Sequence, residues 1–121
     1  MMLKTTTDLT LRIRKFTAKL EPWWAIIGAP IIQEPIFRFI PYQFFYLPTE
    51  RFWEVGLISS LIFASIHWYF GKYFVIYAFV GGMVLWWTMV NFGLVRAIIV
   101  HSLVNVIDLS LGWRKFLSKL K

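Results

Sequence analysis

Two side chains of opposite charge, Glu34 and Arg38, lie beside Gln33 within a stretch of apolar sequence. Four residues apart on a helix, they share one face, and the acid precedes the base, which is the better order for an ion pair. An ionisable group in hydrocarbon costs roughly 3 kcal/mol or more, so such groups persist where they are paired, solvated or functional. The pattern therefore has two interpretations: a structural ion pair between helices, or a buried polar site.

The two histidines of the chain also lie in apolar stretches. Phe63 precedes His67 by four residues, and His101 precedes Asn105 by four, so each pair shares a helix face. Either pattern alone arises often by chance, and a lone buried histidine is usually just hydrogen-bonded to a neighbouring helix. Because these polar residues lie in separate apolar segments, one convergent site inside the membrane explains them better than several independent hydrogen bonds.

Asp108 is a further acidic candidate, because it lies on the same helix face as His101 and Asn105. A carboxylate in that position could accept a proton in a catalytic site. Charged groups near the end of a membrane helix more often lie at the interface with water. We favour this interfacial interpretation for Asp108.

Metal and heme sites are also compatible with the two histidines. His67 and His101, on separate helices, could bind zinc together with a carboxylate, or serve as the axial ligands of a heme b. Nothing else in the sequence favours a heme. The chain contains no cysteine, which excludes disulfides, thiolate metal sites and cysteine-based catalysis.

Composition indicates the elements that must position these residues. With 59% hydrophobic and only 16% charged residues, the chain is typical of an integral membrane protein. Apolar segments are expected at 23–47, 52–70, 73–90 and 94–111, and the last three have about 18 residues each, close to what crosses a ~30 Å hydrocarbon core. The sequence therefore predicts an all-α fold, a polytopic membrane helical bundle of about four transmembrane helices with an N-terminal amphipathic interfacial helix.

The chain divides into three predicted regions: a basic amphipathic N-terminal segment (1–21), a membrane-embedded core (22–111) and a basic C-terminal tail (112–121). Short links make the helices antiparallel neighbours, with both termini on one side of the membrane. The basic residues expected on that side are Lys4, Arg12, Arg14, Lys15, Lys19, Lys72, Arg114, Lys115, Lys119 and Lys121. The positive-inside rule places this side in the cytoplasm or in an equivalent compartment such as the stroma.

The N-terminal segment has an apolar face and a basic face. The apolar residues, at helical spacing, are Leu9, Ile13, Phe16 and Leu20. The basic residues on the other face are Arg12, Lys15 and Lys19. This pattern is typical of a helix that lies on an anionic lipid surface. The net charge of +7 therefore indicates membrane lipids as partners, and no nucleic acid, because the basic residues gather at the chain ends.

The first apolar segment contains Pro30, Pro35 and Pro41. Proline predicts kinks or breaks, so the segment could form one kinked helix or two shorter pieces. In lipid, the backbone groups that proline leaves unpaired must bind neighbouring helices or water, so we expect this element to lie against protein or a wet cavity. In the third segment, Gly81 and Gly82 predict close packing against a neighbouring helix.

The three polar motifs together resemble those of the CPBP family, the CAAX-protease and bacteriocin-processing (Abi) intramembrane endopeptidases. The matching stretches, in chain order, are Gln33-Glu34-x-x-x-Arg38, Phe63-x-x-x-His67 and His101-x-x-x-Asn105. The resemblance covers about residues 22 to 108. It omits the additional membrane helices of usual members, so the chain is similar to a minimal catalytic core.

The resemblance implies hydrolysis of a peptide bond inside the membrane by an activated water molecule. In the family, the first Glu of the first motif and the His of the second activate the water, while the His and Asn of the third stabilise the oxyanion. By this resemblance His67 orients the water, and His101 with Asn105 binds the oxyanion. The scheme requires no cofactor, and zinc is the alternative. This chain has Gln33 where the family has the first Glu, and an amide takes up no proton at neutral pH.

Glu34 is the adjacent carboxylate that could replace the missing base, although it lies roughly 100° further around the helix. Pairing with Arg38 would weaken it as a base, and the two residues would then support the site. Two classes of function follow. One is an intramembrane peptidase, a hydrolase that cleaves a membrane-tethered or prenylated polypeptide. The other is a proteolytically silent relative, a pseudoenzyme that acts as a small structural or assembly subunit of a larger membrane protein complex.

Overall fold

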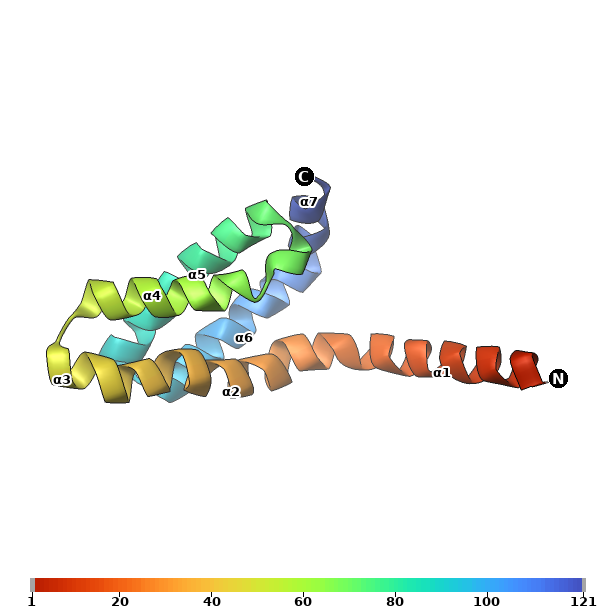
Figure 1. The fold of residues 1–121 in the computed structure, drawn as a ribbon, viewed down its shortest axis with the longest axis horizontal. Coiled ribbons are helices and arrows are strands. Elements are labelled where there is room, and N and C mark those ends of the chain that lie inside the picture. The colour runs from red at the N-terminus through yellow and green to blue at the C-terminus, as the bar shows by residue number, and fades with distance from the viewer. Residues whose placement is uncertain (1, 121) are drawn as a thin grey trace.

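The computed structural model describes residues 2–120 as helices and short turns, without a strand among them (Figure 1). This confirms the predicted all-α class. Residues 1 and 121, and the side chains of residues 2–7, 114 and 118, lie outside the described part. The predicted basic side chains of Lys4, Arg114 and Lys121 lie outside it as well.

The elements in chain order are α1 (Met2–Trp23), the π-helical turn η1 (Trp24–Gly28), α2 (Ala29–Glu34), the π-helical turns η2 (Pro35–Phe39) and η3 (Tyr42–Tyr46), α3 (Leu47–Thr49), α4 (Phe52–Ser65), the 3-10 turn η4 (Trp68–Phe70), α5 (Lys72–Phe92), α6 (Leu94–Leu111) and α7 (Trp113–Lys119).

The chain from α1 to α3 is one continuous helical run, which we call the first helix. Its prolines widen the helix instead of breaking it. In η1 the N–H of Ala29 donates to the carbonyl of Trp24, five residues back, and η2 and η3 close in the same way. A wider turn lets the helix continue through residues that lack an N–H. Of the two predicted alternatives, one helix is therefore the one observed.

The second helix is shorter than the predicted segment 52–70. α4 ends at Ser65, and the N–H of His67 donates to the carbonyl of Ala64, three residues back, at 3.0 Å. This tight turn leads into η4. Gly71 then adopts a φ of 101°, which side chains other than glycine rarely tolerate, and α5 begins. The apolar sequence continues past this point, so composition alone did not reveal the early end.

α5 and α6 follow the predicted third and fourth segments closely, and Gly93 joins them with a φ of 92°. Both helices are long and apolar enough to cross a membrane, and α4 is apolar but shorter. Large apolar side chains such as Ile58, Ile76 and Val95 are exposed on the outside of these helices. Exposed apolar surface of this extent is typical of a protein that contacts lipid or partner subunits.

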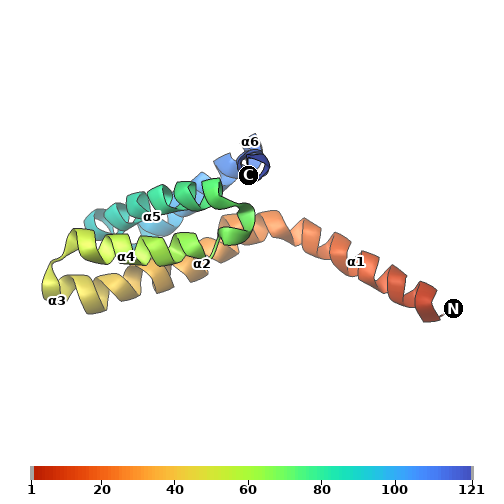
Figure 2. The same cartoon turned by 45° about the horizontal axis from the view of Figure 1, so that its top comes forward.

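The helices form a bundle from which α1 projects (Figure 1). α4 runs back beside the first helix and contacts it through η2 and η3. α5 packs along α4, α6 contacts both α5 and the η1–α2 part of the first helix, and α7 folds against α5 and α6. Figure 2 shows α1 bending away from the bundle, so that the N-terminus lies far from the C-terminus.

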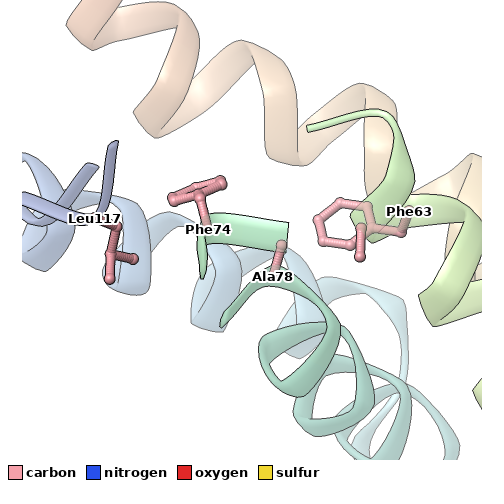
Figure 3. Close-up of a cluster of buried hydrophobic side chains, with 5 residues drawn as sticks. Phe63, Phe74, Ala78 and Leu117 are labelled. Atoms are coloured by element: carbon pink, nitrogen blue, oxygen red, sulfur yellow. The ribbon is translucent and has the colours of Figure 1, made fainter. Parts of the chain in front are cut away.

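A buried apolar cluster from α4, α5 and α7 lies at the end of the bundle near the C-terminus. Its members are Phe63, Ala64, Phe74, Ala78 and Leu117. In Figure 3, Phe74 stands between Leu117 on one side and Ala78 and Phe63 on the other. Because lipid is as apolar as these side chains, the cluster stabilises the bundle by close packing more than by exclusion of water. It also holds the ring of Phe63, which borders the polar residues described below.

Trp86 joins α5 to the start of α4. The side chain is completely buried, and its Nε1–H donates to the carbonyl of Phe52 at 3.0 Å. The indole ring lies on Gly56, where an added Cβ would come within 2.4 Å of ring atom Cδ1. Only a glycine leaves this contact undisturbed.

Gly56→Ala should therefore destabilise the bundle. The methyl group would displace Trp86, at a cost of about 1–3 kcal/mol, the usual range for an overpacked core. Gly81→Ala is the matched control, because nothing lies within 4 Å of its added Cβ. Thermal unfolding in detergent, followed by circular dichroism, should show a lower midpoint for Gly56→Ala only. Equal midpoints for both variants and the wild type would contradict this packing.

Candidate functional site

Glu34, the last residue of α2, is completely buried and links two helices. The Nδ1 of His101 on α6 donates to its Oε1 at 2.7 Å. The other carboxylate oxygen, Oε2, lies 3.4 Å from Nε of Arg38. The predicted ion pair on one helix face is thus present, and it forms part of a buried polar cluster. The ion pair itself lies within the first helix, and the link to another helix is the contact of Glu34 with His101.

Arg38 is completely buried where η2 meets α4 and α5. Its guanidinium carbon lies 4.5 Å from the centre of the Phe63 ring, in a cation–π contact. A Cβ added at Gly82 would lie 3.3 Å from Nη2 of Arg38 and 3.2 Å from Cβ of Ser60. Gly82 therefore makes the predicted close approach. The same prediction is wrong for Gly81, which faces open space and lines the cavity described below.

Phe63 separates the charged pair from His67. The centre of its ring lies 4.8 Å from that of His67 and 5.8 Å from that of His101. The Nδ1 of His67 donates to the backbone carbonyl of Phe63 at 2.8 Å. A carbonyl only accepts, so Nδ1 carries the proton, and Nε2 is the basic nitrogen of the neutral ring. Phe63 and His67 are neighbours as predicted, although a turn after α4 positions His67 instead of a continuing helix.

Asn105 connects α6 to the first helix. Its Nδ2 donates to the backbone carbonyl of Ala25 in η1. In a π-helical turn a carbonyl pairs with the N–H five residues on, and for Ala25 that residue is Pro30, which has none. The side chain of Asn105 therefore supplies the missing donor, in the way expected for proline inside a membrane. A second N–H on the same nitrogen is available to another acceptor.

One cavity of about 450 Å³ brings the motifs together. The predicted site residues that line it are Gln33, Phe63, His67, His101 and Asn105. Glu34 and Arg38 are fully buried and do not line the cavity. They lie behind its wall, where Glu34 accepts the hydrogen bond from Nδ1 of His101.

Asp108 also lines the cavity, so protein side chains surround it. The side chain is only 5% exposed, and it accepts a hydrogen bond from the hydroxyl of Tyr77 on α5 at 2.5 Å. The reason is that α5 and α7 cover the last turns of α6. The spacing of Asp108 after His101 and Asn105 was the available indication in the sequence. Nothing in the sequence pointed to Tyr77.

The arrangement of these side chains fits a reaction that hydrogen-bond donors and a basic nitrogen assist. In the described part of the chain, no three side chains of His, Asp or Glu lie close enough together to hold a metal ion. The Nε2 of His67 can bind a water molecule, and His101 and Asn105 can donate to an oxygen atom that becomes negative. These are the requirements of water attack on a carbonyl group.

Comparison with known families agrees with this chemistry. The family described as type II CAAX prenyl endopeptidase Rce1-like matches residues 17–107, which include all three motifs. Comparison with curated proteins and with solved structures found no match. The family is membrane-embedded, in agreement with the two helices, α5 and α6, that are long and apolar enough to span a bilayer. The chain therefore belongs to the Rce1-like family of CAAX-protease-type membrane proteins, as the resemblance of its three motifs to the CPBP family predicted.

Proposed function

We propose that this protein is an intramembrane endopeptidase that hydrolyses a peptide bond in a membrane-tethered, prenylated polypeptide. The observation that carries the proposal is that His67, His101 and Asn105 border one cavity. Membership of a family of CAAX prenyl endopeptidases supports the same reaction. The reaction as proposed uses water and side chains alone.

In the proposed mechanism, His67 orients the attacking water through Nε2, and His101 and Asn105 bind the oxyanion. Because Nδ1 of His101 donates to Glu34, its Nε2 carries a proton only when the ring is an imidazolium. The hydrogen bond to Glu34 fixes the orientation of the ring. Glu34 is thus a positioning residue, and Arg38 in turn balances its charge.

The proposed topology has four membrane crossings: the first helix from η1 onward, α4 with η4, α5, and α6. The length and apolar composition of α5 and α6 support two of them. The exposed isoleucines along the first helix and α4 support the other two. Four crossings place both termini on one side, which the positive-inside rule assigns to the cytoplasm or its equivalent. The described basic residues on that side are Arg12, Arg14, Lys15, Lys19, Lys72, Lys115 and Lys119.

The partner proposed for α1 is an anionic lipid surface. The apolar residues that α1 exposes, by 46% to 62%, are Leu9, Ile13, Phe16 and Leu20. The exposed basic residues on its other side are Arg12, Lys15 and Lys19. The bend of α1 away from the bundle leaves both faces accessible (Figure 2). Apolar area and positive charge together favour binding to anionic headgroups.

Spin labels can test this placement of α1 in the full chain, which has no cysteine of its own. In nanodiscs with anionic lipid, a label at Phe16→Cys should be accessible to oxygen and shielded from a water-soluble nickel complex. The neighbouring label at Lys15→Cys should show the reverse. Nanodiscs of zwitterionic lipid are the control and should weaken this contrast. Equal nickel accessibility at the two positions in anionic nanodiscs would refute the proposal, because it describes a helix surrounded by water.

A second candidate function is favoured by Gln33. This amide lines the cavity at the motif position where the family has a glutamate, and it cannot take up a proton. A silent relative would keep the fold and act as a structural or assembly subunit of a larger membrane complex. Its exposed apolar surface would then bind partner subunits as well as lipid.

Cleavage of a prenylated, fluorogenic CAAX peptide by the purified protein distinguishes the two candidates. We expect the wild type to cleave it, and His67→Ala to lower the rate at least about 100-fold, the usual contribution of a positioned acid or base. Ser65→Ala, which alters an exposed side chain of the same turn, is the matched control and should keep the wild-type rate. Activity that appears only in Gln33→Glu would instead identify the silent relative.

A further inference from the structure

We propose that Asp108 is the proton acceptor that serves this site in place of the glutamate of the first motif. The inference rests on the proposed peptidase activity. It is carried by a buried carboxylate that lines the same cavity as the oxyanion-binding residues.

The two residues of the first motif leave this role open. Attack by water needs a group that accepts its proton. Gln33 lines the cavity, but its amide is not basic. Glu34 is a carboxylate, but its oxygens face His101 and Arg38, and it does not line the cavity. His67 binds the water, and the carboxylate that acts beside it in place of the first Glu must therefore come from another element.

Two carboxylates of the described residues line the cavity, Glu21 and Asp108. Glu21 is exposed and belongs to α1, which projects from the bundle. Asp108 is almost fully buried, and the hydroxyl of Tyr77 orients its Oδ1. A carboxylate inside a membrane helix is costly, and a functional role is the first hypothesis for it. Burial and orientation therefore select Asp108.

The position of Asp108 along α6 suits a base that acts on a water attacking a carbonyl group bound by His101 and Asn105. Asp108 lies seven residues after His101, about 10 Å further along the helix at 1.5 Å per residue, and Asn105 lies between them. A carbonyl oxygen bound by His101 and Asn105, its carbon, and an attacking water span roughly this length at contacts of about 3 Å. The proposal places the water between this carbonyl carbon and Asp108, which lines the same cavity.

In the proposed step, Asp108 takes one proton from the water, directly or through a bridging water, while the water oxygen bonds to the carbonyl carbon. The electron pair of the C=O double bond moves to the oxygen, which His101 and Asn105 stabilise. When this intermediate collapses, the C–N bond breaks and the proton on Asp108 passes to the leaving nitrogen. One water is consumed, and Asp108 returns to its carboxylate form.

Asp108→Asn tests this assignment, because it keeps the shape of the side chain and removes the proton acceptor. We expect a kcat at least about 100-fold below that of the wild type on the prenylated peptide. The double variant Gln33→Glu/Asp108→Asn should recover most of this loss, because it returns a carboxylate to the cavity from α2. A purely structural role of Asp108 would not be rescued in this way. Glu54→Gln, at an exposed acid far from the cavity, is the matched control and should keep the wild-type kcat.

Tyr77→Phe provides a second variant if Asp108→Asn does not fold. It removes the hydrogen bond to Asp108 and leaves the carboxylate in place. A lost hydrogen bond to a charged group corresponds to a fall in kcat of about tenfold, with an unchanged KM. An unchanged kcat in Tyr77→Phe would count against the orienting role of this hydroxyl, and so against the proposal.

The outcomes separate this inference from the proposed function. A normal kcat in Asp108→Asn overturns the assignment, as does a double variant that stays inactive while Gln33→Glu alone is active. Activity confined to proteins with Gln33→Glu overturns it too, because Asp108 then supplies no base in the wild type. No cleavage by either the wild type or Gln33→Glu overturns the peptidase activity itself.

Discussion

The buried carboxylate of Glu34 is the interaction on which the polar interior of this bundle depends. A charge in so apolar an environment persists only with compensation, and here it comes from His101 on one side and Arg38 on the other. The contacts tie α2 to α6 and hold the guanidinium of Arg38 over Phe63. Removing the carboxylate would leave the charge of Arg38 buried without its counter-ion, which in general costs several kcal/mol. The charge pair therefore supports two residues that line the cavity, His101 and Phe63.

A second constraint is that backbone groups inside a membrane need partners. Pro30 cannot provide an N–H to the carbonyl of Ala25, and Asn105 does so from α6. Asn105 also lines the cavity, as His101 does. The same residue therefore supplies a donor to the backbone of the first helix and borders the candidate site. The prolines of the first helix thus contribute to the site, because the wide turns that accommodate them leave an acceptor for a side chain of another helix.

Much of the architecture was predictable because it depends on local spacing and composition. The pairing of Glu34 with Arg38 follows from side chains four residues apart on a helix. Phe63 and His67 also meet as that spacing predicts, although a turn after α4 brings them together. The all-α class follows from long apolar segments in a chain with few charges. The early end of α4 and the continuity of the first helix were not predictable in the same way. α4 ends at a hydrogen-bonded turn, and the first helix continues through π-helical turns. The spacing of apolar residues in the sequence does not predict either feature.

By itself the sequence determined which residues carry chemistry and which of them share a helix face. Tertiary structure alone decided that Glu34 meets His101, 67 residues further along the chain, and that Gln33 borders the cavity while Glu34 lies behind its wall. It also decided that Asp108 is buried beneath α5 and α7 and lines the cavity. The physical reason is that the period of a helix sets neighbours along its own surface. Which face meets a cavity, a charge or the lipid depends on the helices packed around it.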